Sequence, residues 1–200
     1  MLEGLQNGDS GDLYFILIHL SNSRLCPQGL QEELHTLMQV STPELRTCAA
    51  SILILSPKYA AAAVPILAEA VRGDDAVSSI NAAIALGHAG INVTLCVNRL
   101  CEAITDCDLP RQMLAINGLS KMGSSATEII PKLIEMVQDP SLDISLRATI
   151  AQLLPKIQRN DQVERVLSDL LTNDNWELVL GAALGLTDDP QNPLSDLAMM

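Results

Sequence analysis

Apolar residues recur along this chain at two spacings, a short one within helices and a long one between them. From Ile129 to Val137 they fall every three or four positions, and the same spacing returns from Leu142 to Leu154. This is the spacing of one helical face. Pro131 suits the first turn of a helix, and Asp139-Pro140-Ser141 predicts a tight turn between the two segments. Residues 127–157 are therefore predicted to form an antiparallel pair of helices.

The same pattern returns about every 33 residues. When the chain is aligned on this period, one column contains leucines and a second column contains mostly small residues. A third column, four residues after the second, again contains leucines. A small residue lets stacked helices approach closely, and a fixed period of this length is the signature of stacked-repeat proteins. The three columns are Leu34, Leu67, Leu100, Leu133 and Leu167; Ala49, Ala82, Ala115, Thr149 and Ala182; and Leu53, Leu86, Leu119, Leu153 and Leu186.

The periodicity predicts an all-α fold, an α-α superhelix (solenoid) of about five to six stacked helix pairs, with no β-sheet. We expect a single repeat domain over residues 1–200. Its predicted divisions are a partial repeat at 1–27, repeats at 28–57, 58–90, 91–125, 126–159 and 160–187, and a flexible acidic tail at 188–200.

Turn and breaker residues set the predicted helix ends. Gly90 and Gly123 are expected to end helices, Gly90 as a left-handed cap, and Pro155 is expected to end or kink its helix. Outside residues 127–157, helices are predicted at Ser10–Leu20, Leu30–Val40, Pro43–Leu55, Ala61–Arg72, Ala76–Ala89, Val93–Thr105, Pro110–Met122, Gln162–Thr172 and Trp176–Leu186.

Two segments, residues 61–89 and 129–154, resemble HEAT repeats. Both have a proline near the start of the first helix, a leucine two residues later, an acidic turn and an alanine-containing second helix that ends in leucine. The resemblance implies that partners bind along a concave surface lined by the second helices. HEAT repeats often pair a second-helix arginine with the turn aspartate. Arg46, Arg111 and Arg147 are the candidates here, whereas the second repeat has Ser79. Ankyrin and tetratricopeptide repeats have similar periods, but their motifs are missing.

The charge of the chain limits the classes of partner that we expect it to bind. The net charge is −12, and the excess of acidic over basic residues lies mainly in the first 42 and the last 42 residues, whereas the middle is near balance. Nothing in this pattern supplies a basic stripe for phosphates, so nucleic acid is not expected as a partner. A basic protein partner and simple solubility both remain open as explanations of the charge. The N-terminal residues do not resemble a signal peptide, and no membrane insertion is expected. We therefore expect a cytoplasmic, reducing location.

The sequence contains few residues in patterns that indicate catalysis, metal binding or disulfide bonds. Five cysteines include no CxxC pair, and Cys48 and Cys96 fall at core positions, so neither disulfides nor a metal site is expected. The histidines are scattered over different repeats, and the glycines form no phosphate-binding motif. We therefore predict no catalytic residues, no metal and no cofactor, and we predict that the chain is not an enzyme.

The predicted function is a scaffold or adaptor that binds a protein or peptide along the concave second-helix surface. Alternatives are a structural segment of a larger solenoid and a HEAT-like enzyme of the bilin lyase type, which the aromatic content of 2% disfavours. Trp176 either contributes to binding or covers the open end of the last repeat. The proposed partner-binding residues are Arg46, Thr47, Ser51, Ser79, Asn81, Arg111, Gln112, Asn117, Lys121, Arg147 and Trp176.

The N-terminal end suggests a second contact surface. Residues 13–20 are apolar on nearly every side, and a helix of that kind must be covered by something. We expect Tyr14, Phe15 and Ile18 to pack against another copy of the chain, a partner or a further repeat. A homo-oligomer formed through this end is one prediction.

Overall fold

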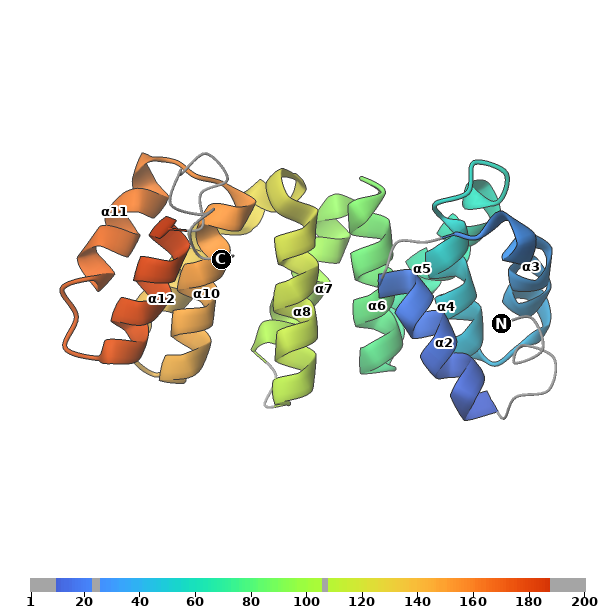
Figure 1. Ribbon diagram of the computed structural model, residues 1–200, viewed down its shortest axis with the longest axis horizontal. Helices are drawn as coiled ribbons and strands as arrows, with labels where there is room; N and C mark the ends of the chain where they lie inside the picture. The colour runs from blue at the N-terminus through green and yellow to red at the C-terminus, as the bar shows by residue number, and fades with distance from the viewer. Residues whose placement is uncertain (1–9, 23–25, 106–107, 188–200) are drawn as a thin grey trace, which may run out of the picture. The chain divides into compact units, whose positions relative to one another are not determined.

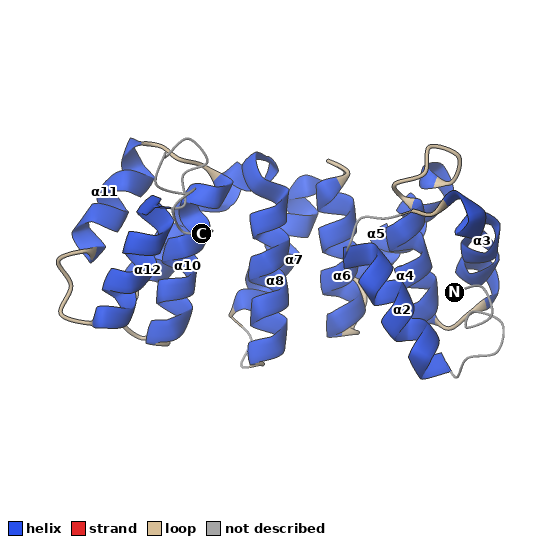
Figure 2. Ribbon diagram, viewed as in Figure 1, coloured by secondary structure: helices blue, strands red, loops and turns tan. Residues whose placement is uncertain are grey.

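A computed structural model describes residues 10–22, 26–105 and 108–187 of the chain. Every regular element in these ranges is a helix, as Figures 1 and 2 show. The prediction of an all-α fold is therefore confirmed. The first nine residues of the predicted partial repeat and the predicted flexible tail lie outside the described residues.

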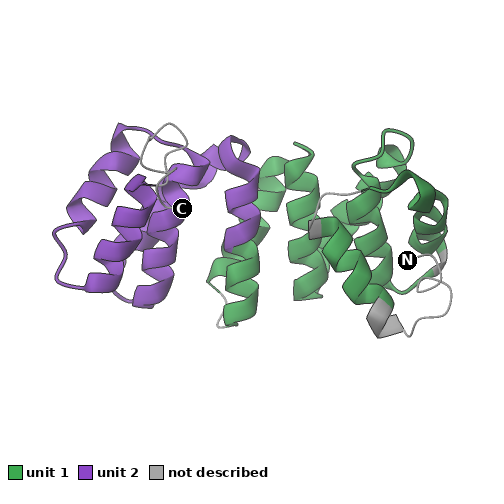
Figure 3. Cartoon of the chain, in the orientation of Figure 1, with its two compact units in different colours: residues 1–115 green, residues 116–200 purple. Residues whose placement is uncertain are grey.

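The chain divides into two compact units, residues 1–115 and 116–200, shown in green and purple in Figure 3. The helix α8 (Leu109–Met122) begins in the first unit and ends in the second. The predictions of one continuous domain and of a solenoid with a 33-residue period remain predictions.

Unit 1 contains the helices at the positions that the apolar spacing predicted. Local chemistry sets two of their starts. Pro43 occupies the first turn of the helix that it begins, and the Asp75 side chain caps the start of the helix that follows it. The elements are α2 (Ser10–Asn22), the 3-10 helix η1 (Gln28–Leu30), α3 (Gln31–Val40), α4 (Pro43–Leu53), α5 (Ala60–Val71), α6 (Ala76–His88) and α7 (Val93–Ile104).

Neighbouring helices of unit 1 bury their apolar faces against one another. The helix α3 packs with α4, α5 packs with α6, and α6 packs with α7. The helix α4 also contacts both α2 and α6, so three helices separated in sequence lie in succession (Figure 1). Leu34, Leu67 and Leu100 are fully buried in this core.

Unit 2 is centred on α10 (Ile144–Ile157), which contacts three other helices. These are α9 (Ile130–Gln138), α11 (Asp161–Leu170) and α12 (Trp176–Thr187), and the 3-10 helix η2 (Gly123–Ile129) packs on α9 and α10. Leu133 and Leu167 are fully buried in this unit, as their leucine column predicted, while Glu135 is exposed.

The helix α12 approaches α10 through glycine. A Cβ placed on Gly181 would lie 2.5 Å from the Ala148 carbonyl oxygen, and one on Gly185 would lie 2.8 Å from the Ala151 oxygen. Only a residue without a side chain allows two helix backbones to come this close. The Gly181 and Gly185 positions therefore set the packing of unit 2.

Two predicted turns have the expected hydrogen bonds. Gly90 is left-handed, with φ of 70°, its N–H donates to the Gly87 oxygen and the Ile91 N–H donates to the Leu86 oxygen. This is a Schellman motif at the end of α6. In unit 2, the Ser141 N–H donates to the Asp139 carboxylate at 2.9 Å, which forms the predicted Asx turn.

In unit 2 the expectation for Thr149 was wrong, and so was one of the two alternatives for Pro155, that it ends its helix. Thr149 was placed in the column of small buried residues, but it is only half-buried and its hydroxyl donates to the Ser145 oxygen, whereas the neighbouring Ala148 is buried. Pro155 does not end its helix, because α10 continues to Ile157. A proline in the last turn removes a single helical hydrogen bond, so the helix still completes its final residues.

Candidate functional site

Unit 1 contains a surface cleft of about 360 Å³ with a largely apolar lining. It lies where the turn between α5 and α6 meets the first turn of α4. The lining combines apolar side chains with four carboxylates and one guanidinium. The residues are Pro43, Glu44, Arg46, Thr47, Ile66, Glu69, Ala70, Gly73, Asp74, Asp75 and Ser78.

The turn that forms one wall of this cleft is fixed by its own hydrogen bonds. The Arg72 guanidinium donates to the Ala68 oxygen at 2.8 Å, and the Gly73 N–H donates to the Ala70 oxygen at 3.0 Å. The Asp75 carboxylate then caps α6 by accepting from the Ser78 N–H at 2.7 Å. The local sequence therefore holds the turn in place before any ligand arrives.

Some of the charged side chains in the cleft make hydrogen bonds within the protein, and others do not. Asp75 is engaged in its cap, and the Arg46 Nε donates to the Met38 carbonyl oxygen at 3.1 Å. Glu69 and Asp74 are exposed, and neither makes a hydrogen bond or ion pair through its carboxylate with another described residue. These two carboxylates, together with Glu44, give the cleft an acidic rim.

A second cleft of about 440 Å³ continues from the first and shares Gly73 and Asp74 with it. A third, of about 170 Å³, shares Arg99 and Glu102 with the second. We call this run of three clefts, from Glu44 on α4 to Thr105 at the end of α7, the turn-edge groove.

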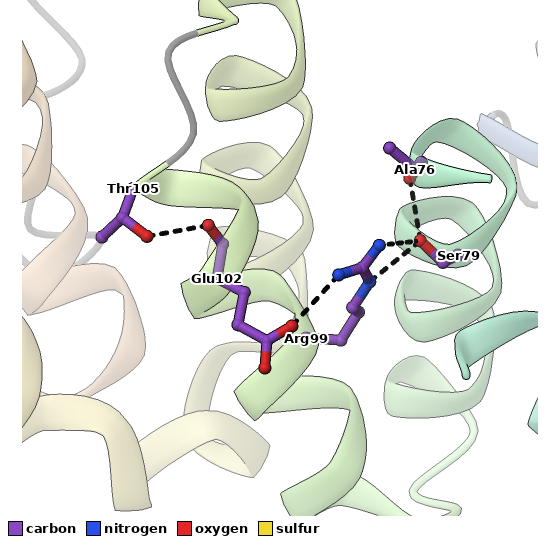
Figure 4. A network of polar contacts seen from close by, with 5 residues as sticks. All are labelled: Ala76, Ser79, Arg99, Glu102 and Thr105. Atoms are coloured by element: carbon purple, nitrogen blue, oxygen red, sulfur yellow. Dashed lines mark hydrogen bonds and ion pairs between the residues drawn. The ribbon is translucent and has the colours of Figure 1, made fainter. Parts of the chain in front are cut away.

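Arg99 lines both the second and the third clefts, and Figure 4 shows its contacts with Ser79 and Glu102. Its Nε and Nη2 donate to the Ser79 hydroxyl oxygen at 2.9 and 2.8 Å, and its Nη1 lies 3.1 Å from the Glu102 carboxylate. The Ser79 hydroxyl in turn donates to the Ala76 oxygen. Arg99 therefore links α7 to the preceding helix α6.

The structure does not leave all of the predicted binding residues on the surface. Thr47, Ser51 and Ser79 are buried, and their hydroxyls donate to backbone oxygens in the preceding turn of their own helices, at Pro43, Thr47 and Ala76. Hydroxyls satisfied in this way can sit in a core. Their assignment to an accessible binding surface was wrong.

The remaining predicted residues are at least partly accessible. Asn81 and Gln112 are half-buried, while Asn117, Lys121 and Trp176 are exposed. Trp176 is 69% exposed at the start of α12. On α2, Phe15 is 74% exposed, and Tyr14 and Ile18 are half-buried.

Of the three candidate arginines, Arg111 forms an ion pair with an aspartate in the turn before its helix, Asp108. Arg46 and Arg147 each donate through Nε to a carbonyl oxygen at the end of the preceding helix, Met38 at 3.1 Å and Val137 at 2.7 Å. Arg111 lies 3.2 Å from Asp108, three residues before it. Among the described residues these arginines therefore cap helix ends or pair locally.

Of the cysteines, Cys48 and Cys96 are buried, as predicted, and Cys26 and Cys101 are half-buried thiols. Cys107 lies outside the described residues. In the described ranges, no three histidine, cysteine, aspartate or glutamate side chains are grouped so that they could hold a metal ion.

Two of the predicted binding residues, Arg46 and Thr47, line the first cleft of the turn-edge groove, but its acidic rim was not predicted from the sequence. Asp74 and Asp75 stood out as adjacent acids, but the sequence gives no sign that Glu44 and Glu69 lie beside them. The sequence shows only that Glu44 follows Pro43 at the start of one helix, and that Asp74 and Asp75 end the turn before a later helix. Their meeting depends on how α4 packs against α5 and α6.

No protein-family model matches this chain, and no curated protein or solved structure shows a significant similarity to it. Over the residues placed by the structure, no helix is both long and apolar enough to cross a membrane.

Proposed function

We propose that the chain is a noncatalytic, HEAT-like α-solenoid that acts as an adaptor by binding a basic segment of another protein in the turn-edge groove. The observation that carries the proposal is the first cleft, which combines an apolar floor with the carboxylates of Glu69 and Asp74, neither of which is paired. An apolar side chain of the partner would occupy the floor, and a lysine or arginine would lie against the rim.

The proposal changes the location of the binding surface that the sequence suggested. Ser51 and Ser79 are buried on the second helices, whereas the groove lies at the turns between first and second helices. Of the predicted residues, the groove includes only Arg46 and Thr47. The net charge of −12 supports a basic partner, because it would attract such a segment over long range.

The test uses a labelled peptide of alternating arginine and leucine residues, and a matched peptide with glutamate in place of arginine. Fluorescence anisotropy would measure binding to the wild type and to the double variant Glu69→Lys and Asp74→Lys. We expect the double variant to bind the basic peptide about tenfold more weakly, which corresponds to about 1.4 kcal/mol. Raising the salt concentration should also weaken wild-type binding.

The control is the double variant Asp169→Lys and Asp174→Lys, which changes the net charge equally at exposed positions of unit 2. It should bind the basic peptide like the wild type. Equal weakening by both variants would mean that the peptide responds only to net charge, and the proposed site would be wrong.

We also propose self-association through α2 as a separate property. It rests on Phe15, whose ring is 74% exposed although α2 buries Leu13, Leu17 and Leu20 on its other side.

A further inference from the structure

The first cleft of the turn-edge groove contains one cation among its carboxylates. Arg46 lines this cleft and is half-buried, and its Nε donates to the Met38 carbonyl oxygen at 3.1 Å. This bond orients the rigid, planar guanidinium. The end of the group formed by Nη1 and Nη2 makes no hydrogen bond or ion pair with another described residue. Arg46 therefore keeps both Nη groups as donors for a ligand of the cleft.

The acids of the same cleft do not satisfy this guanidinium. Within the described ranges, no ion pair joins Arg46 to any carboxylate of the lining, which are those of Glu44, Glu69, Asp74 and Asp75. A ligand that covers a half-buried guanidinium removes part of its water, and the removal is costly unless the ligand brings an acceptor. A segment with only basic and apolar side chains would bring none except its backbone carbonyls.

We propose that the partner segment bound by the turn-edge groove carries one glutamate or aspartate among its basic residues, and that this carboxylate pairs with Arg46. An apolar side chain next to it would lie against Ile66, and the flanking lysine or arginine residues would lie against Glu69 and Asp74. The inference rests on the proposed function of the groove, and it narrows the partner from a basic segment to one of mixed charge.

Charge complementarity supports this arrangement. A carboxylate matches the end of the guanidinium, because its two oxygens accept from Nη1 and Nη2 in parallel, which a backbone carbonyl cannot do. Repulsion from Glu44, Glu69 and Asp74 is weaker, because these side chains are exposed to solvent, which screens their charge. The basic residues of the same segment would also neutralise them.

Unit 2 contains a matched arginine. Arg147 is half-buried too, and its Nε donates to the Val137 carbonyl oxygen at 2.7 Å, as that of Arg46 does to Met38. Arg147 lines none of the three clefts of the turn-edge groove. It therefore makes the same kind of bond outside the groove and serves as a control.

The test measures a preference for glutamate over glutamine. Peptides of alternating arginine and leucine would carry one glutamate at each arginine position in turn, and a matched set would carry glutamine there. Fluorescence anisotropy would give the dissociation constants. At one position we expect the wild type to bind the glutamate peptide about tenfold more tightly than the glutamine peptide. At the other positions glutamate should not improve binding, because it would meet only the acidic rim.

Replacing Arg46 should remove this preference. With Arg46→Gln the two peptides should bind within about twofold of each other, and Arg46→Lys should keep only a small preference, because an ammonium cannot form the paired bonds. Arg147→Gln should keep the preference of about tenfold. Each comparison is between two peptides on one protein, so a partly unfolded variant would weaken both apparent affinities equally and leave their ratio unchanged.

Two results would overturn the inference while the groove remains a binding site. One is that glutamate improves binding at no position, although Glu69→Lys with Asp74→Lys still weakens binding of the parent peptide. The other is a preference for glutamate that persists in Arg46→Gln, because the carboxylate would then pair with another residue. If no peptide binds the wild type at all, the proposed function is wrong and this inference is wrong with it.

Discussion

Buried thiols are the titratable groups that the core affects most strongly. Burial raises the pKa of the Cys48 thiol to about 12, with a further contribution from the nearby Glu44 carboxylate, and raises that of Cys96 to about 11. Both positions were expected in the core from their place in the helical pattern. The fold therefore keeps these two cysteines protonated, and unreactive as nucleophiles, at neutral pH.

This pKa shift predicts a loss of stability at alkaline pH. The unfolded chain loses its thiol protons near the ordinary pKa of 9.0, whereas folded Cys48 and Cys96 retain theirs up to about 12 and about 11. The folded state then binds more protons than the unfolded state, so the free energy of unfolding falls as the pH rises above 9. The stability is fully present below that pH.

Urea unfolding at about pH 8 and about pH 10 would measure this fall. The double variant Cys48→Ala and Cys96→Ala should be less stable at pH 8 but should show a smaller loss between the two pH values. An identical loss in the variant and the wild type would mean that other groups cause it.

At the scale of the helices, the positions of most elements could be predicted because apolar spacing and turn residues agree. The predicted ends of α5, α6 and α7 differ from the observed ends by a single residue. The errors arose where a hydrogen bond or a neighbouring helix decides the outcome. Whether Thr149 or Ala148 is buried, for example, depends on the rotation of α10 against α12, which the sequence of α10 alone does not reveal.

The closest helix contact gives a prediction for glycine. Replacing glycine by alanine within a helix usually stabilises it by up to about 1 kcal/mol. At Gly181 the new methyl group would lie 2.5 Å from the Ala148 oxygen and 2.9 Å from its Cα, both of them backbone atoms that cannot rotate away. We expect Gly181→Ala to destabilise the protein by about 1–3 kcal/mol in urea unfolding.

Gly29→Ala is the matched control, because nothing lies within 4 Å of a Cβ at that position. It should change the free energy of unfolding by less than about 1 kcal/mol. A Gly181→Ala protein as stable as the wild type would show that α12 and α10 are not in such close contact.

At the scale of the whole molecule, the sequence predicted the class of fold but not the site. The repeat period and the charge distribution predict a series of similar helix pairs in a chain whose two ends are acidic. The turn-edge groove arises only when packing brings Glu44 of α4 beside Glu69 and Asp74 at the turn between α5 and α6. A pattern that repeats cannot indicate which copy forms a cleft, because the clefts depend on side chains that differ between copies.

Self-association is the prediction that belongs to this scale. Light scattering of the wild type should give a mass above that of the monomer, which is 21.5 kDa, because exposed Phe15 and half-buried Ile18 pack against another copy. The double variant Phe15→Glu and Ile18→Glu should restore the monomer mass.

The control for self-association is Leu109→Glu with Met113→Glu, which places the same charges on exposed apolar positions of α8. It should leave the oligomeric state unchanged. A wild type that stays monomeric at high concentration would show that the α2 surface is not an interface.

The bond between Arg99 and Ser79 has a consequence for modular engineering of this chain. Helix pairs are usually exchanged, duplicated or deleted as blocks cut in the loops between them, which here would separate α6 from α7. Such a cut places Ser79 in one block and Arg99 in the next, although the guanidinium lies 2.8–2.9 Å from that hydroxyl. A transplanted block that begins at α7 would keep the ion pair of Arg99 with Glu102 but would lose the Ser79 hydroxyl that accepts from Nε and Nη2. Chimeras cut instead within the turn between α5 and α6 would keep both residues together and should tolerate exchange better.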